Sequence, residues 1–266
     1  MDHLPWSMDF PITPKFLLWT INDIFPILLH QKRGIMKPLF TAFLSLCFCV
    51  QIYGQCNSFF PLKENVRYEY EMFDKKEKMT ARMTHTMKNI SGSGGTMKAT
   101  LAQEIFDGKK GDKISSSELN WACENGTLHF DLASMNLMMD NTQQMNMAES
   151  GMSIDVTGDQ LDLPSDLEVG QKLKDVSYTV KMTMGTVTLM NRTFTVKDRK
   201  VETRENLTTP AGTFDCYKVT FITEDEKGRD QKSSVWYAKE AGMIKNENFT
   251  NDGKLITRQL LVKIAK

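Results

Sequence analysis

The sequence has little histidine, no excess of charge of either sign and none of the common catalytic motifs. Its 266 residues include only four histidines, and 33 Lys and Arg balance 33 Asp and Glu. Without residues 1–54, 29 basic residues face 30 acidic ones, so the remainder lacks the positive potential of a nucleic-acid binder. GxSxG, HExxH and SxxK are missing from it, and SGSGG at residues 91–95 is not followed by the Lys-Ser/Thr of a P-loop. We therefore expect no enzyme, no cofactor and no nucleic-acid partner.

Cysteine is also sparse, which limits the disulfides that the chain can form. The five cysteines are Cys47, Cys49, Cys56, Cys123 and Cys216. The first two lie in the signal peptide predicted below, and the other three permit one disulfide in an oxidising compartment. The sequence leaves open whether Cys123 and Cys216 form it. Cys123 is close to His129 in the sequence, but a catalytic pair also needs an orienting partner, so we interpret both cysteines as buried structural residues.

No apolar run is long enough for a membrane helix, which needs about 20 apolar residues. Residues 36–54, MKPLFTAFLSLCFCVQIYG, instead combine a basic start, a short apolar run and a small final residue. This arrangement is typical of a secretory signal peptide, and we predict cleavage after Gly54. Lipidation of Cys56 is the alternative, but Gln55 is not the small residue that a lipobox places before its cysteine. We therefore expect an exported protein, periplasmic or secreted.

Residues 1–35 show neither a helical nor a strand period, and Asp23 and Pro26 interrupt their apolar part. A charged residue at mid-span opposes a transmembrane helix. We interpret this segment as an upstream extension that precedes the true start at Met36, with a genuine leader or anchor as the alternative. The predicted organisation is thus an extension at 1–35, a signal peptide at 36–54 and a single β-rich domain at 55–266.

The sequence does contain clear alternation of apolar and polar residues in the predicted domain. A period of two is typical of antiparallel strands with one buried face. Gln103 is the one polar residue on an otherwise apolar face, and turn signals such as Asn125-Gly126 separate the segments. Ten or so strands are expected. The apolar positions are Val66, Tyr68, Tyr70 and Met72; Met79, Ala81, Met83 and Met87; Met97, Ala99, Leu101 and Ile105; Val176, Tyr178, Val180, Met182 and Met184; and Ile256, Leu260, Val262 and Ile264.

A methionine-rich stretch at residues 133–152 breaks the alternation. At 100° per residue, five of its methionines fall within an arc of roughly 140°, and a leucine lies just beyond the edge of that arc. We predict one amphipathic helix, or two short ones, lying across the sheet with the thioether face turned inward. The predicted ligand-binding residues on this face are Met135, Met138, Met139, Met145, Met152 and Leu132.

Three interpretations of this methionine face stay open. Methionine fills irregular gaps in a core, and the same softness suits an adaptable surface for apolar ligands. Thioether sulfur also binds Cu(I), but such sites usually recruit histidine or cysteine, and the predicted domain contains only His85 and His129. Methionine is moreover spread over the whole chain, with 18 copies. We therefore predict no metal site.

Three segments resemble the TapB-like envelope proteins of Gram-negative bacteria. Residues 58–78, SFFPLKENVRYEYEMFDKKEK, resemble their opening strand, and residues 161–182, LDLPSDLEVGQKLKDVSYTVKM, resemble their central passage. The most specific segment is ENLTTPAGTFDCYKV at 205–219, which is followed by VWYAKEAGMIKNEN at 235–248. These residues define turns and strands first, since Gly212 suits a positive φ in the turn that begins at Pro210. None is carried over as catalytic.

The resemblance implies a strongly curved antiparallel sheet or half-open barrel around an apolar hollow, similar in shape to the LolA and LolB lipoprotein carriers. The methionine helices would then act as a lid over the concave face. The expected function is non-enzymatic binding of a lipid or another apolar small molecule. The alternative is a structural or assembly factor of the cell envelope that binds a protein partner. Fold likeness alone carries little weight for function.

Overall fold

A computed structural model describes most of the chain after the predicted signal peptide. In this part, thirteen strands form one antiparallel sheet, and no segment is helical. Consequently, no described helix is long and apolar enough to cross a membrane. The predicted fold class, a mainly β domain with a curved, open antiparallel sheet, is confirmed for these residues. They belong to one compact unit, Tyr53–Lys266, and comprise residues 56–60, 63–130, 152–226, 228 and 230–265.

The thirteen strands vary widely in length. Their order across the sheet is β6-β8-β9-β10-β11-β12-β13-β1-β2-β3-β4-β5-β7, with every neighbouring pair antiparallel. In chain order they are β1 (Arg67–Asp74), β2 (Met79–Ser93), β3 (Thr96–Asp107), β4 (Lys113–Glu124), β5 (Thr127–Phe130), β6 (Met152–Gly158), β7 (Leu161–Pro164), β8 (Val176–Met184), β9 (Val187–Thr209), β10 (Gly212–Asp225), β11 (Gln231–Ala238), β12 (Gly242–Thr250) and β13 (Leu255–Ala265).

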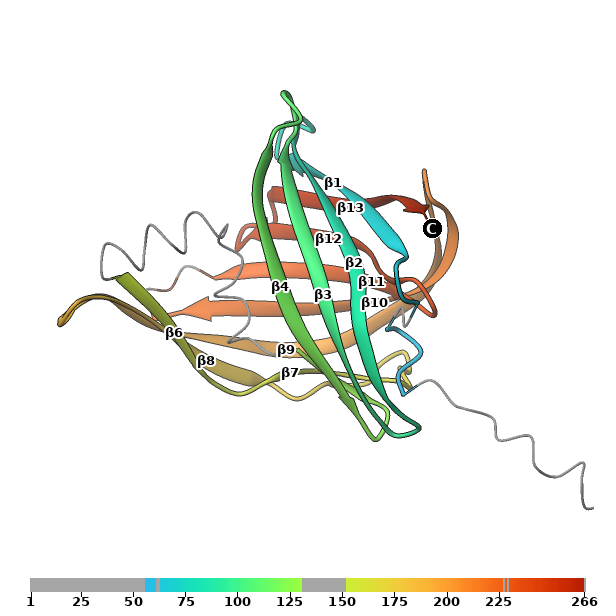
Figure 1. Cartoon of the computed structure of the whole chain (residues 1–266), viewed down its shortest axis with the longest axis horizontal. Helices are drawn as coiled ribbons and strands as arrows, with labels where there is room; N and C mark the ends of the chain where they lie inside the picture. Colours follow the sequence, from blue (N-terminus) through green and yellow to red (C-terminus); the bar gives the residue numbers. More distant parts are fainter. Residues whose placement is uncertain (1–55, 61–62, 131–151, 227, 229, 266) are drawn as a thin grey trace, which may run out of the picture. The chain divides into compact units, whose positions relative to one another are not determined.

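The sheet turns strongly along its strand order. Strands β2, β3 and β4 stand steeply across β9, β10 and β11 in Figure 1, although all belong to the same sheet. Register shifts interrupt several pairings, for example between β10 and β9 and between β1 and β13. Such bulges increase the local right-handed twist and bend the strand that carries them. The curvature gives the sheet a concave face on which the apolar side chains collect.

The predicted alternation holds in the strands that line this face. Tyr68 and Tyr70 of β1 are buried, and so are Ala99 and Leu101 of β3. The predicted alternation is wrong near the C-terminus. It placed Leu261 on the outward face, but this side chain is fully buried. The reason is the bulge that places Leu261 opposite Tyr70 and changes the side-chain parity of β13. Two predicted inward residues are in fact exposed, namely Ile264 of β13 and Met184 at the end of β8.

The two edges of the sheet approach each other without pairing. Strand β6 lies at one edge and β7 at the other, yet only Asp159 and Gln160 separate them in the chain. The segment after β7 then hydrogen-bonds to β9, with Leu173 N donating to Arg199 O at 2.8 Å and Val201 N to Gln171 O at 2.9 Å. The side chain of Arg199 donates to main-chain carbonyls on the same side of the sheet. The segment after β7 is thereby attached to β9 at residues 199–201.

Buried apolar residues form two clusters against the sheet. The first cluster includes Phe59, Phe60, Leu101 and Leu128 and is centred on β3, β4, β5 and β7. The second cluster includes Tyr68, Tyr70, Trp236, Ile244 and Leu261 and is centred on β1, β11, β12 and β13. Strand residues make up most of each cluster, and residues outside the strands, such as Phe59 and Phe60, complete it. The space between the clusters becomes the candidate site.

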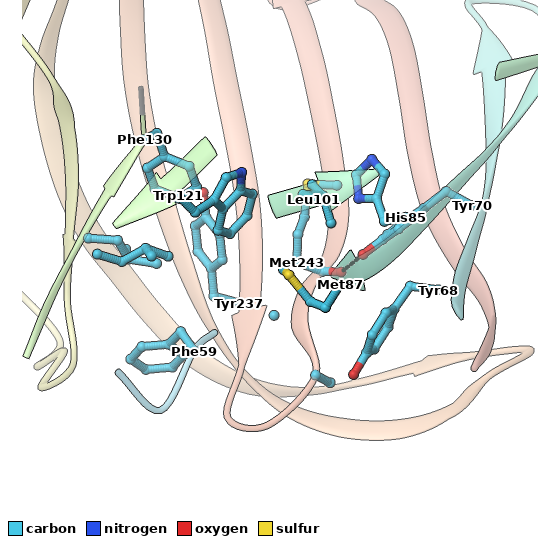
Figure 2. A pocket seen from close by; sticks show the side chains of 14 residues that line it. Phe59, Tyr68, Tyr70, His85, Met87, Leu101, Trp121, Phe130, Tyr237 and Met243 are labelled. Carbon is cyan, nitrogen blue, oxygen red and sulfur yellow. Dashed lines mark hydrogen bonds between the residues drawn. The ribbon is translucent and has the colours of Figure 1, made fainter. Parts of the chain in front are cut away.

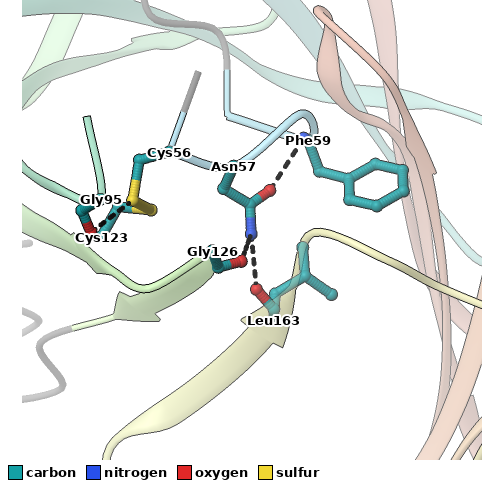
Figure 3. The surroundings of a disulfide bond; sticks show 7 residues. All are labelled: Cys56, Asn57, Phe59, Gly95, Cys123, Gly126 and Leu163. Carbon is teal, nitrogen blue, oxygen red and sulfur yellow. Dashed lines mark hydrogen bonds between the residues drawn. A yellow bond between two sulfur atoms is a disulfide. The ribbon is translucent and has the colours of Figure 1, made fainter. Parts of the chain in front are cut away.

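A short N-terminal segment, residues 56–60, is seated in the first cluster (Figure 3). Cys56 forms a disulfide with Cys123 of β4 across a Cα–Cα distance of 6.0 Å. The fully buried side chain of Asn57 donates through Nδ2 to the carbonyls of Gly126 and Leu163, at 3.0 and 2.7 Å. Its Oδ1 accepts a hydrogen bond from the backbone N–H of Phe59 at 2.8 Å. The segment therefore joins the β4–β5 turn to β7.

The disulfide answers the question that the sequence left open. Cys216 is a free, buried thiol, so it does not pair with Cys123. The expectation that Cys123 is a buried structural residue is confirmed. Because the sulfur of Cys56 is already bonded to a second sulfur, it has no valence left for a thioether-linked lipid in this state.

Replacing Cys56 and Cys123 by serine together is expected to lower the free energy of unfolding by roughly 4 kcal/mol. The reason is that the bond closes a loop with a sequence separation of 67 residues and so restricts the unfolded chain. Urea unfolding followed by fluorescence measures the change. Wild-type protein in reductant should match the double variant, and equal stability with and without reductant would contradict the assignment.

Most of the predicted methionine helix lies outside the described residues. Leu132, Met135, Met138, Met139 and Met145 fall in the stretch 131–151, for which the structure gives no description. Met152 is the exception, and here the prediction is wrong: it begins strand β6 and pairs with Met184 of β8. Met152 belongs instead to the alternating segment MSIDVTG, which forms β6.

Candidate functional site

An apolar pocket lies between the two buried clusters, with a cavity volume of about 150 Å³. Its lining combines Met87, Leu101 and Leu128 of the first cluster with Tyr68 and Tyr70 of the second. Strands β1 to β5, β7 and β11 and the turn before β12 all contribute side chains (Figure 2). The pocket is thus bordered by members of both clusters.

Aromatic rings form one wall of the pocket. Trp121 of β4 packs against Phe130 of β5, with ring centroids 4.8 Å apart in an edge-to-face arrangement. Phe60 stacks on Trp121 at 4.7 Å, and Phe59 meets the edge of Tyr217 at 5.6 Å. Such pairs stabilise by about 0.5–1.5 kcal/mol each beyond the burial of their area. The N-terminal segment thus holds the aromatic wall in place.

Tyrosine hydroxyls bring a limited polar character to the pocket. The hydroxyl of Tyr70 donates to the carbonyl of Met243 at 3.0 Å. Burial raises the pKa of Tyr70 above its ordinary value, and the neighbouring Tyr68 and Tyr237 add to that shift. Burial likewise raises the pKa of Tyr237 to about 12. These phenols are therefore neutral at physiological pH, and no Lys, Arg, Asp or Glu lines the described pocket.

His85 and Gln103 form a polar pair at the pocket. His85 Nε2 lies 3.0 Å from Gln103 Oε1, and it also contacts the sulfur of Met83 at 3.0 Å. Burial lowers the pKa of His85 to about 4, and the hydrogen bond with Gln103 opposes that shift. The ring of Tyr70 packs against the imidazole with centroids 5.0 Å apart. His85 is therefore neutral at pH 7.

The sequence indicated the inward direction of His85 and Gln103 separately, but it did not indicate that they form a pair. His85 has the same strand parity as Met83 and Met87, so its inward direction follows from the alternation of β2. Gln103 was visible as the polar exception on β3, and the structure buries it to 3% exposure. Their approach could not be read from either strand alone, because it depends on the register that pairs His85 with Gln103.

The ligand-binding role predicted for the residues of the methionine face stays a prediction. Five of them lie outside the described part of the chain, and the backbone of Met152 lies in β6, at the sheet edge opposite β7. The pocket is instead lined by residues spread from Phe59 to Met243. Two of these, Met87 and Met243, are methionines, but they stand on strands and not on the predicted helix.

The other reactive side chains of the described residues offer little nucleophilic character. Cys123 is bound in the disulfide, so the pairing with His129 that the sequence raised does not occur. His129 Nδ1 instead lies 2.7 Å from Asp162 Oδ1. Burial raises the pKa of the Cys216 thiol to about 12, which keeps it protonated. No group of three His, Cys, Asp or Glu side chains in the described part is arranged to hold a metal ion.

The stability of the protein is expected to fall between pH 6.5 and pH 4 because of His85. In this window the unfolded chain binds a proton that the folded protein does not, since the folded pKa is the lower one. The part of the unfolding free energy that comes from the lowered pKa of His85 is fully present above pH 6.5. It amounts to at most about 3 kcal/mol, because the ring keeps some exposure to the pocket.

Urea unfolding of wild type and His85→Gln at pH 7, 5.5 and 4.5 measures this effect. The variant should lose less stability on acidification than wild type does, because glutamine does not titrate. The same pH slope in both proteins would show that His85 titrates normally. His129→Gln provides the control for loss of the other histidine in the described residues.

Comparisons with known proteins place the chain in a family and a fold. Residues 63–261 match the model of the DUF3108-like family, and the chain belongs to that family. A Bacteroides fragilis protein described as exported and as having a YmcC-like fold superposes with a TM-score of 0.62 at 19% identity, covering 79% of this chain and 100% of its own. A Parabacteroides distasonis protein described as a lipoprotein gives 0.61 at 20% identity, with coverage of 80% and 100%.

These structures establish a shared YmcC-like fold and nothing finer, because their identities to this chain are low. No protein of curated function matches the sequence. Of the resemblance drawn from the sequence, membership of the DUF3108-like family and a YmcC-like fold are confirmed, whereas the TapB-like and LolA-like likeness stays a prediction. The exported and lipoprotein descriptions of the two structures agree with an address in the cell envelope.

Proposed function

We propose that this member of the DUF3108-like family is an exported, non-enzymatic binding protein that holds a lipid or another apolar ligand in the pocket between its two clusters. The observation that carries the proposal is an apolar cavity of about 150 Å³ whose described lining has no charged side chain. Apolar cavities of this size stay dry and can accept small apolar molecules. Filling the space with a ligand restores the packing contacts that an empty cavity loses.

The size of the cavity limits what part of a ligand it holds. An engineered cavity of about 150 Å³ in another protein binds benzene, so this pocket suits a ring or the end of an alkyl chain. A whole lipid would place only its terminal part between Leu101 and Tyr68. The remainder would lie beyond the pocket.

Export is supported by two features of the chain. Residues 36–54 have the build of a signal peptide, and the disulfide Cys56–Cys123 requires an oxidising compartment. A periplasmic or secreted protein fits both. Because Cys56 is bound to Cys123, we favour a protein without a lipid anchor at this residue, in contrast to the lipoprotein description of one structural neighbour.

A second candidate function is that of an envelope assembly factor that grips a protein partner. The observation in its favour is the β8–β9 hairpin, where Met184, Val187 and Leu189 are 45%, 57% and 49% exposed. Large apolar side chains gathered on an exposed hairpin mark a surface suited to an interaction. The pocket and this hairpin are separate features, so each function can be removed alone.

Protein purified from its own host is expected to carry an apolar molecule that native mass spectrometry detects. Leu101→Trp should reduce that occupancy at least tenfold, because the larger side chain occupies the cavity that Leu101 now borders. Leu189→Trp makes the same change on the exposed hairpin and should leave the ligand in place. A thermal melt of each variant establishes that it is folded.

The two functions give different results in this experiment. Repeated recovery of empty wild-type protein would overturn the binding proposal. Stoichiometric capture of an envelope protein by delipidated wild type, lost in Leu189→Asp and kept in Leu101→Trp, would establish the assembly factor instead.

A further inference from the structure

Planar rings dominate the lining of the pocket between the two clusters. Seven of the fourteen lining residues carry a ring, and six of these are Phe, Trp or Tyr, which together make up only 9% of the chain. They come from the N-terminal segment and from strands β1, β2, β4, β5 and β11. An inward strand face requires apolar side chains, but it does not by itself favour rings over aliphatic groups. The enrichment is therefore a property of the pocket and not of one strand.

The rings form two groups that belong to different clusters. Trp121, Phe130 and Tyr237 pack against the first cluster, whereas Tyr68 and Tyr70 belong to the second. Figure 2 shows these two groups on different sides of the pocket. A guest that occupies the pocket therefore has rings on two sides.

Contacts with neighbouring side chains hold several of these rings in place. Trp121 packs against Phe60 and Phe130, with ring centroids 4.7 and 4.8 Å apart. Tyr70 packs against His85 with centroids 5.0 Å apart. Aromatic side chains have few rotatable bonds, so they lose little conformational entropy when a guest binds. The positions of these rings are thus set before a guest arrives.

We propose that the pocket selects a guest with an aromatic ring over a saturated ring or an alkyl chain of similar size. An aromatic ring has a negative face and a positive edge, so two rings attract each other beyond the gain from burying apolar area. A saturated guest buries apolar area without this attraction. The inference rests on the proposed binding function and names the class of ligand: a small aromatic molecule, or a lipid that ends in an aromatic ring.

Two further features of the lining suit a single aromatic ring. Met87 and Met243 line the pocket, and thioether sulfur makes favourable contacts with aromatic rings, often at the ring edge. The cavity volume of about 150 Å³ matches that of an engineered cavity in another protein that binds benzene. One ring therefore fits the space and meets groups that attract it.

The alternative is that the rings serve only as large apolar side chains. Affinity would then follow the transfer of the guest out of water. This transfer is more favourable for a saturated hydrocarbon than for an aromatic one with the same number of carbon atoms, because the saturated molecule has more apolar surface and water interacts weakly with an aromatic face. The two interpretations therefore predict opposite orders of affinity.

Toluene, methylcyclohexane and heptane have the same number of carbon atoms, so they are suitable probes. Headspace gas chromatography at pH 7 measures their dissociation constants for delipidated full-length mature protein. We expect toluene to bind at least about tenfold more tightly than either saturated probe. Phe130→Leu removes one ring from the lining but keeps an apolar side chain, so it should lower this preference by roughly twofold to tenfold.

The molecule released from protein purified from its own host separates the two sources of such a ring. Its ultraviolet absorption spectrum should be that of an aromatic compound, and its mass distinguishes a small molecule from a lipid. A released molecule without aromatic absorption would overturn the inference and leave the binding function standing.

Leu128→Ile is the matched control, because it changes an aliphatic lining residue and keeps every ring. It should keep the wild-type preference for toluene. A thermal melt shows whether each variant is folded, and the wild-type series decides the question if Phe130→Leu does not fold. Toluene that binds no more tightly than the saturated probes would contradict the selection of aromatic rings but not the binding function. No binding of any probe by wild type would overturn both.

Discussion

The structure depends on the packing of five residues, 56–60, against the inside of the sheet. The disulfide from Cys56 fixes this segment to β4, and the amide of Asn57 joins the β4–β5 turn to β7. Phe59 and Phe60 then fill space that the strands alone leave open. Because burial of each large aromatic ring stabilises by about 1.5–3 kcal/mol, this segment contributes far more than its length suggests. It also gives the pocket one of its sides.

The chemistry of the pocket follows from the same inward face. Strands that bury apolar residues on one side exclude water, and low polarity in turn keeps His85 and Tyr70 uncharged. Under the proposed binding function, the uncharged lining favours uncharged guests, because an unpaired ion in an apolar site is strongly disfavoured.

Local patterns in the sequence predicted the strands because one buried face leaves a period-two signature, as in residues 66–72 and 97–105. The pattern could not reveal the bulge that turns Leu261 inward, since a bulge changes parity without a mark in composition. The pairing of Cys56 with Cys123 and the approach of His85 to Gln103 both join residues from separate elements, so they require the three-dimensional register. The predicted helix was wrong at Met152, because the sequence pattern at this residue fits both a helical period and the alternation of β6.

The two-residue connection from β6 to β7 restricts how a guest can reach the interior. Three backbone steps from Gly158 to Leu161 span at most about 11 Å even when fully extended. The sheet edges therefore cannot swing apart at this point like a gate unless a strand detaches from β5 or β8. Under the proposed binding function, a guest would instead have to pass side chains that line the pocket, such as Phe59 and Phe130.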